Sequence, residues 1–379
     1  MDKKVIPEAF HSGEYIRDEL KARDWTQADL ANILGFPPSI VSDVITGRRS
    51  ISPEIATALG EAFNTSAQVW LNVQAAYQLA QESSKDDVVK RRAALYDKAP
   101  IREMQKRGWI ESSSNVDILE SQLCRFLEID SIEKRSEFAA AARKSTDYKG
   151  VTPSQGAFLA RVRQLARVLE VDAPYNGAQF NALLGELVTL LPSPEDIQCI
   201  PRVLANYGIR LLILEQIPGS KMDGACMWLD NDPTKPVVVV SLRYDRIDFF
   251  WHTLCHELCH VKLGEGLDHP LVEVAMIGFD AQPFDKKVAS ERKADRFAVE
   301  FLVNQAELED FVFRYDPVFS RKAILGFSER VGTHPGLVVG QLQHRRKLPY
   351  SHMRALLVKV RDIITKVALT DGWGRTVAA

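Results

Sequence analysis

The segment from Trp251 to His260 carries the side chains best suited to chemistry, in the pattern His-Glu-x-x-His at His256, Glu257 and His260. In a helix, the two histidines lie one turn apart on the same face, so both imidazoles can reach one metal ion. Glu257 lies beside them, where it can hold and deprotonate a water molecule at that metal. The pattern therefore predicts a zinc site in which Glu257 is the general base.

Catalytic zinc needs a third protein ligand and an open fourth position. We expect this ligand to be Glu291, which Asp295 follows at the helical spacing i, i+4. On a second helix, Glu291 can bind zinc while Asp295 accepts a hydrogen bond from a ligating imidazole and fixes its tautomer. The alternative is an ordinary solvated helix face. An apolar stripe beside Glu291 and Asp295 argues against a solvated face. It is formed by Ala294, Phe297, Ala298, Phe301 and Leu302.

Several elements must position these groups. Residues 237–241 form an apolar run typical of a short buried strand, and residues 249–263 are typical of an apolar helix. Residues 208–214 and 224–229 predict two more strands, so a small sheet should lie beside the metal helix. The alternative is a buried helix that carries two histidines and a glutamate by chance, but unpaired buried polar groups are costly.

Residues 200–345 resemble the ImmA/IrrE family of zinc metallopeptidases. The matching segments are Asp223–Ala225, Ser241–Arg246, the His256–His260 motif, and Glu291 with Ala294, Asp295, Phe297 and Ala298. The resemblance implies a zincin-like fold and a gluzincin-like site with zinc on His256, His260 and Glu291. It also implies an enzyme that cleaves transcriptional repressors or antitoxins.

Two further side chains are candidate hydrogen-bond donors to the transition state, namely Tyr244 and His334. Structural packing is the alternative for Tyr244, and His344 is a further candidate beside His334. Cys255 and Cys259 interleave with the histidines, but each lies about 100° of helix rotation away from one. We expect these two thiols to pack as small apolar groups.

Residues 1–80 predict an all-helical module with helices near 15–20, 26–34, 38–46, 52–63 and 66–80. Thr26 and Asp29 suit a capping box, Pro38 suits a helix start, and Gly35 and Gly47 suit helix ends. Helix, tight turn and helix form the helix-turn-helix pattern.

This module resembles the XRE-type helix-turn-helix and, within it, the HigA-like antitoxin branch. The segments Asp24–Gln27, Gly47–Pro53 and Ser66–Asn72 carry the likeness. The resemblance implies that Gln27, Arg48 and Arg49 contact DNA phosphates. It also implies that exposed positions of the third helix read bases, and these are expected to be Ser39, Ser42 and Asp43, with Val41 and Val44 inward.

The charge of this module favours only weak DNA binding. Residues 1–80 hold seven Lys and Arg against ten Asp and Glu, a net charge of −3. Phosphate attraction supplies much of DNA affinity, and the expected base-reading positions lack Arg, Lys, Gln and Asn. We therefore expect weak binding per module, strengthened by a homodimer. The alternative is a module for protein contacts.

Residues 81–204 are almost wholly helical in pattern, with segments near 88–95, 100–108, 115–128, 131–144, 153–170, 177–191 and 195–207. We interpret them as a helical connector that spaces the two ends, or else as a sensor or toxin-docking surface. The predicted domains are 1–80, 81–204, 205–350 for the metallopeptidase, and 351–379 for a C-terminal helix and tail. The predicted fold class is α+β, mainly α.

The overall composition narrows the class of protein. Hydrophobic residues make up 46% and charged residues 26%, which is ordinary for a soluble globular protein. Scattered cysteines and the lack of a long apolar run indicate a cytoplasmic protein that does not bind membranes. We predict a DNA-binding regulator whose zinc endopeptidase cleaves a repressor or antitoxin, in trans or itself, in a stress, phage or toxin-antitoxin response. The alternative is a non-proteolytic antitoxin or repressor whose metal domain is structural or a sensor.

Overall fold

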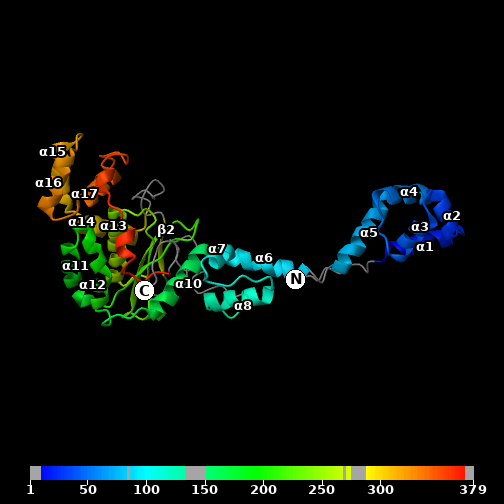
Figure 1. The fold of residues 1–379 in the computed structure, drawn as a ribbon, viewed down its shortest axis with the longest axis horizontal. Helices are drawn as coiled ribbons and strands as arrows, with labels where there is room; N and C mark the ends of the chain where they lie inside the picture. The colour runs from blue at the N-terminus through cyan, green and yellow to red at the C-terminus, as the bar shows by residue number, and fades with distance from the viewer. Residues whose placement is uncertain (1–9, 83–85, 133–150, 268–269, 275–286, 372–379) are drawn as a thin grey trace. The chain divides into compact units, whose positions relative to one another are not determined.

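The computed structural model describes residues 10–82, 86–132, 151–267, 270–274 and 287–371. The chain forms two compact units, residues 1–93 and 94–379. Helices dominate both, and one four-stranded sheet lies in the second (Figure 1). The predicted fold class, α+β and mainly α, is confirmed.

The first unit consists of short helices whose ends are set by local signals. Thr26 and Asp29 form the predicted capping box, and Gly35 and Gly47 end their helices at φ values of 72° and 81°. Apolar faces meet in a core that includes Ile16, Leu30, Val44 and Leu59. The helices are α1 (Ser12–Arg23), α2 (Gln27–Leu34), α3 (Pro38–Thr46), α4 (Pro53–Phe63) and α5 (Ala67–Glu82).

The boundary between the two units lies within a helix, α6 (Asp86–Lys98). The predicted domain boundary after residue 80 falls before this one, and residues 83–85 lie outside the described residues. The predicted helix at 131–144 also lies almost wholly outside them.

The sheet of the second unit has the strand order β1-β3-β2-β4. β1 (Arg210–Ile213) pairs parallel with β3 (Pro236–Val240), and β2 (Met222–Trp228) pairs antiparallel with both β3 and β4 (Leu271–Val274). The three predicted strands are confirmed, whereas β4 was not predicted. At the outer edge of β1, Ile213 donates its backbone N–H to Leu369 O at 3.0 Å.

Helices cover both faces of this sheet. Val238 and Val240 pack toward α11 (Phe180–Thr189), α12 (Ile200–Asn206) and α13 (Ile247–Leu263). Val237 and Val239 pack toward α7 (Ile101–Lys106), α8 (Val116–Leu127) and α10 (Pro153–Val168). A strand buried on both faces needs apolar residues throughout, which explains the run of four valines.

The predicted connector therefore does more than space two ends. Its helices α7, α8 and α10 cover one face of the sheet, and α11 and α12 help to cover the other. These helices complete the core in which the sheet is buried, and the interpretation of residues 81–204 as a connector stays a prediction. The predicted limits of the domains stay a prediction.

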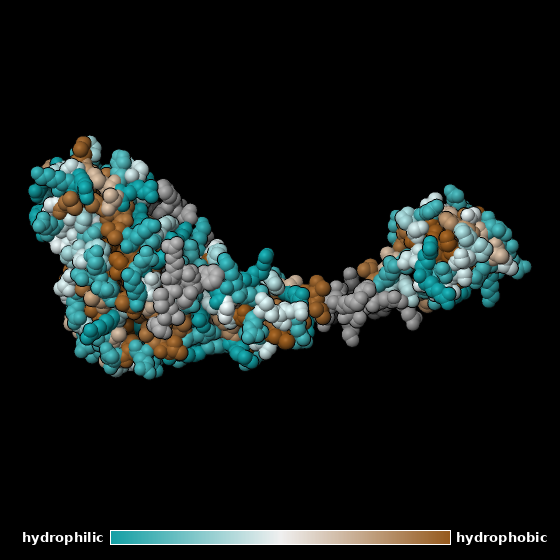
Figure 2. Space-filling model, in the orientation of Figure 1, coloured by the Kyte–Doolittle hydropathy of each residue, from teal (hydrophilic) through white to brown (hydrophobic). Residues whose placement is uncertain are grey.

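The remaining helices follow α13 in the chain. They are α14 (Ala289–Leu302), α15 (Gln305–Tyr315), α16 (Arg321–Val331), α17 (Pro335–His344) and α18 (Arg361–Ile364). The second unit also contains short 3-10 helices at Gly177–Gln179, Pro194–Cys199, Leu229–Asn231 and Arg354–Leu356. Hydrophobic patches are scattered over a largely hydrophilic surface in the view of Figure 2. Among the described residues, no helix is both long and apolar enough to cross a bilayer.

Candidate functional site

Helix α13 crosses the core of the second unit and is buried along most of its length. It begins at Ile247, slightly before the predicted start at 249, and ends at Gly264, whose φ of 66° suits a glycine cap. His256, Glu257 and His260 all have 0% exposure. Such polar groups are stable in a core only when they bind partners, so their surroundings decide what the site can hold.

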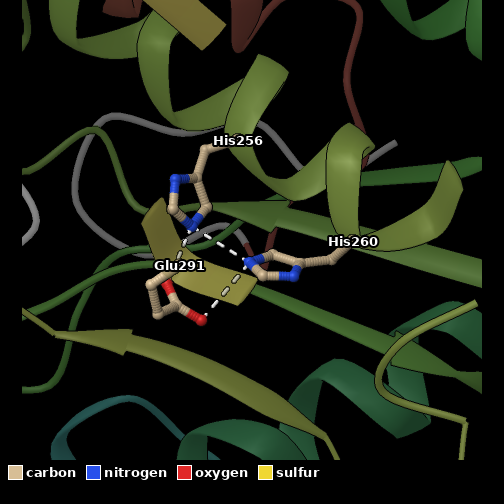
Figure 3. Close-up of side chains that lie close together, drawn as sticks. All are labelled: His256, His260 and Glu291. Atoms are coloured by element: carbon tan, nitrogen blue, oxygen red, sulfur yellow. Dashed lines mark hydrogen bonds and ion pairs between the residues drawn. The ribbon is translucent and has the colours of Figure 1, made fainter. Parts of the chain in front are cut away.

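His256, His260 and Glu291 bring their side chains to one point between α13 and α14 (Figure 3). The Nε2 atoms of the two imidazoles lie 3.0 Å apart. Glu291 Oε2 lies 3.0 Å from His256 Nε2, and Glu291 Oε1 lies 3.6 Å from His260 Nε2. The structure thus brings together the three residues predicted as metal ligands.

The other nitrogen of each imidazole faces a carboxylate. His256 Nδ1 lies 3.0 Å from Asp295 Oδ1, as expected for Asp295, and His260 Nδ1 lies 2.6 Å from Glu265 Oε2. When each Nδ1 donates to its carboxylate, the Nε2 of each imidazole is left to bind a metal ion. Glu265 was not predicted, although its place directly after the Gly264 helix cap could have indicated it.

Three electron-pair donors that meet at one point repel one another unless a cation lies between them. Two imidazoles and one carboxylate form a donor set that suits catalytic zinc. Burial lowers the pKa of His260, with the neighbouring His256 acting in the same direction. Burial would raise the pKa of Asp295, but the hydrogen bond with His256 and the charge of Lys287, whose Nζ is 2.7 Å away, hold it below its usual range.

Glu257 lies against strand β2 of the sheet. A Cβ atom added to Gly224 would lie 2.4 Å from Glu257 Oε1 and 2.7 Å from Thr253 Cγ2. Gly224 is therefore required because a carboxylate occupies the space that a side chain would fill. Glu257, the predicted general base, thus lies on the same helix as the two histidines, and its carboxylate packs against strand β2.

Ser241 and Asp245, from the segment before α13, make hydrogen bonds with the backbone. Ser241 donates its N–H to Asp223 O at 3.0 Å and its hydroxyl to Met222 O at 2.7 Å, which joins the ends of β2 and β3. Asp245 Oδ1 accepts the N–H groups of Val360 and Arg361 at 3.0 and 2.8 Å. These contacts anchor the loop from which α13 begins.

The predicted transition-state donors lie in different surroundings. The Tyr244 ring stacks on Phe249, with the ring centres 4.4 Å apart. His334 caps α17, where its Nδ1 accepts from Gly336 N at 3.0 Å, and its backbone N–H donates to Leu191 O. His344 lines a cavity together with Asp295. The structure thus associates His344, rather than His334, with the surroundings of the metal ligands.

The cysteines beside the histidines are buried and not paired in disulfides. Burial raises the pKa of Cys255 far above its usual range and that of Cys259 to about 11. Both thiols are therefore protonated, and Cys255 belongs to the apolar core. The expectation that they pack as small apolar groups agrees with this environment.

The residues predicted to contact DNA differ in exposure. Gln27, Arg48 and Arg49 are exposed, and so is Ser39 near the start of α3. Ser42 and Asp43 are half-buried rather than exposed, because they flank the inward-facing Val41 and Val44 on a short helix. A backbone hydrogen bond from Arg49 N to Asp43 O, 3.1 Å long, holds the loop after α3.

Comparison with known proteins finds a matching family model in each unit. Residues 16–70 match the family model "Helix-turn-helix", and residues 211–332 match "IrrE N-terminal-like domain", a peptidase family model. A stretch of 76 residues is 32% identical to the uncharacterized HTH-type transcriptional regulator YddM of Escherichia coli, covering 20% of this chain and 81% of that protein. The chain belongs to the helix-turn-helix regulators and carries an ImmA/IrrE-type peptidase domain.

Other relatives match stretches of similar length. Virulence-associated protein I of Dichelobacter nodosus is 38% identical over 78 residues, which cover 20% of this chain and 71% of that protein. The solved structure "Pseudomonas aeruginosa antitoxin HigA with higBA promoter" is 38% identical, covers 21% of this chain and 88% of that chain, and has a TM-score of 0.20. The range matched to the ImmA/IrrE-type domain contains His256, His260, Glu291 and Asp295, whereas His334 and His344 lie beyond its end.

Proposed function

We propose that this regulator binds operator DNA through its first unit and cleaves a protein with a zinc-dependent endopeptidase site in its second. The observation that carries the proposal is the convergence of His256 Nε2, His260 Nε2 and the Glu291 carboxylate, all within 4.8 Å of one another. Glu257, on the same helix as the histidines, is the general base. The match to a peptidase family model supports the same function.

Each side chain of the site has a separate task. His256, His260 and Glu291 hold the zinc, while Asp295 and Glu265 orient the imidazoles through their Nδ1 atoms. When bound, zinc supplies Lewis-acid chemistry that polarises a peptide carbonyl and makes water more acidic. Glu257 accepts the proton of the attacking water and then donates it to the leaving amine.

We infer that the substrate is a repressor or an antitoxin, in trans or the chain itself, in a response to stress, phage or a toxin. The support is the presence of a helix-turn-helix unit and a peptidase-type unit on one chain, together with the family resemblance. A homodimer is proposed for DNA binding, since the predicted module has a net charge of −3 and one copy attracts phosphate poorly. An associated toxin is proposed as a further partner of the first unit.

A comparison of protein termini in stressed host cells tests the peptidase. Cells that contain the wild-type chain are compared with cells that contain Glu257→Gln, and new N-termini are mapped by mass spectrometry. Termini present only with the wild type are the expected result, since loss of a general base slows proton transfer by about 10²–10⁴-fold. The exposed Glu309→Gln, on α15, is the matched control and should behave as wild type.

The second candidate function is a non-proteolytic antitoxin or repressor with a structural or sensory metal. Its support is the complete burial of both imidazoles, because structural zinc sites are closed. Under this function, Glu257→Gln still regulates its own promoter and still neutralises a toxin, and no new termini depend on Glu257. Equal termini in wild type and variant would favour this second function.

A further inference from the structure

A cavity of about 230 Å³ lies among α13, α14 and α17, beside the metal ligands but not lined by them. It reaches Asp295, which contacts the Nδ1 atom of His256. The metal ligand atom of His256 is Nε2, on the opposite side of the ring. The cavity thus lies behind the metal centre, and the proposed peptidase function does not use it.

The wall of the cavity is mainly apolar. Phe249, Val299, Leu302 and Leu337 contribute from three helices. A cavity on the order of 150 Å³ admits benzene, so this one has room for a single ring or a short aliphatic chain. Gly340 belongs to the same wall, and a Cβ atom there would lie 2.4 Å from Asp248 Oδ2.

Both acids of the lining are already neutralised by bases. Arg246 contacts Asp248 through two hydrogen bonds of 3.0 and 2.7 Å, and Lys287 contacts Asp295 at 2.7 Å. Arg345 also lines the cavity and donates to Gln305 at 2.5 Å. A guanidinium has five N–H donors, so Arg345 can hold an additional acceptor such as a carboxylate.

Two histidines add polar contacts. His252 and His344 both line the cavity, and within the described part of the chain no hydrogen-bond partner faces His252 Nδ1, which is buried. His344 is exposed, so the cavity is open to solvent on its side. A polar ligand group near these residues would provide the hydrogen bond that a buried nitrogen needs.

We propose that this cavity is a binding site for a small carboxylic acid with one ring or a short alkyl chain. The carboxylate binds Arg345 and the histidines, and the hydrocarbon part packs on Val299, Leu302 and Leu337. The ligand therefore binds next to Asp295, the residue that orients a metal ligand.

Isothermal titration calorimetry of the full chain with phenylacetate tests the site, with benzyl alcohol and phenethylamine as neutral and cationic comparisons. We expect one phenylacetate per chain with a Kd of about 1 mM or tighter, and binding of the other two at least about 10-fold weaker. Equal binding of all three, or no binding of phenylacetate, would overturn the proposal.

Three controls locate the ligand. The metal-free chain should bind phenylacetate as the zinc-loaded chain does, whereas binding only in the presence of zinc would place the carboxylate on the metal and refute the cavity. Arg345→Gln should weaken binding about 10-fold or more, and the neighbouring exposed Arg346→Gln should leave it unchanged. Val299→Phe, which fills the cavity, should abolish binding while circular dichroism shows the helices intact. If Arg345→Gln and Arg346→Gln have equal effects, the site is wrong.

Discussion

The two units hold their candidate functional groups in opposite environments. In the first unit, Gln27, Arg48 and Arg49 are exposed to solvent. In the second, His256 and His260 are completely buried, and a carboxylate faces the Nδ1 atom of each. Electrostatic interactions are much stronger in a buried site than at a surface screened by water and salt. Single substitutions should therefore have large effects in the second unit and small ones in the first.

The largest effect is expected from removal of a proposed metal ligand. His260→Ala should lower zinc affinity by more than about 100-fold, since removal of a mere orienting partner already costs about 10- to 100-fold. Competition with a chromophoric chelator measures this, and DNA affinity should stay within about twofold of wild type, because the residues predicted to contact DNA lie in the other unit. The exposed His352→Ala is the control. Equal zinc affinity in His260→Ala and wild type would show that the cluster is not the metal site.

The next effect concerns the space around Glu257, the proposed general base. Gly224→Ala places a Cβ atom where Glu257 Oε1 lies, 2.4 Å away, so the carboxylate must move. We expect cleavage to fall about 100-fold, a common consequence of misplacing a catalytic group by about 1 Å, while zinc remains bound. Cleavage by the purified chain, assayed with the substrate found by terminus mapping, is the measurement.

Gly326 provides the matched control for this substitution. It lies in α16, and no atom is within 4 Å of a Cβ added there. Gly326→Ala should leave cleavage unchanged and raise the free energy of unfolding by about 0.5–1 kcal/mol, because alanine favours helix. Unchanged cleavage in Gly224→Ala would show that the packing of Glu257 on β2 is not needed for its role.

A moderate effect is expected from the residues that orient the imidazoles. Asp295→Asn should weaken zinc binding by about 10- to 100-fold. Glu265→Gln should weaken it less, because the Glu265 side chain is 32% exposed against 13% for Asp295, and water can replace part of the lost contact. Chelator competition ranks the two variants. The reverse order would mean that exposure does not govern the contribution of these carboxylates.

The smallest effect is expected at the surface of the first unit. Arg48→Gln and Arg49→Gln should each weaken DNA binding to a similar extent across sequences. Each should also reduce the slope of log K against log salt by about 1. Fluorescence anisotropy at several salt concentrations measures this, and zinc binding should not change. An unchanged slope in both variants would favour the alternative that this unit contacts proteins.

Local signals allowed much of the fold to be predicted. Helix α3 has the predicted bounds, Pro38–Thr46, and the capping box at Thr26 and Asp29 is present. Caps and glycine ends are hydrogen bonds between residues a few positions apart, so the sequence carries them directly. Strand β4 escaped prediction because its place depends on pairing with a distant strand.

The cluster of His256, His260 and Glu291 was predictable for a similar reason. The i, i+4 spacing fixes the common face of His256 and His260, and the same spacing links Glu291 to Asp295. The spacing does not say which carboxylate reaches His260 Nδ1, and Glu265 does so because the chain turns back at Gly264. The spacing also does not say whether His334 or His344 lies near the site. The two residues are the N-cap and the last residue of α17.

The sequence by itself determined the helix ends, the buried strand of valines and the side chains that can bind a metal, because periodicity and spacing act over one or two turns. Tertiary structure alone decided that helices α7, α8 and α10 cover the sheet, that Gly224 makes room for Glu257, and that a cavity lies behind the metal ligands. These features depend on contacts between segments far apart in the chain. An apolar face in the sequence predicts only that the face will be buried. The packing of the whole unit decides which element buries it.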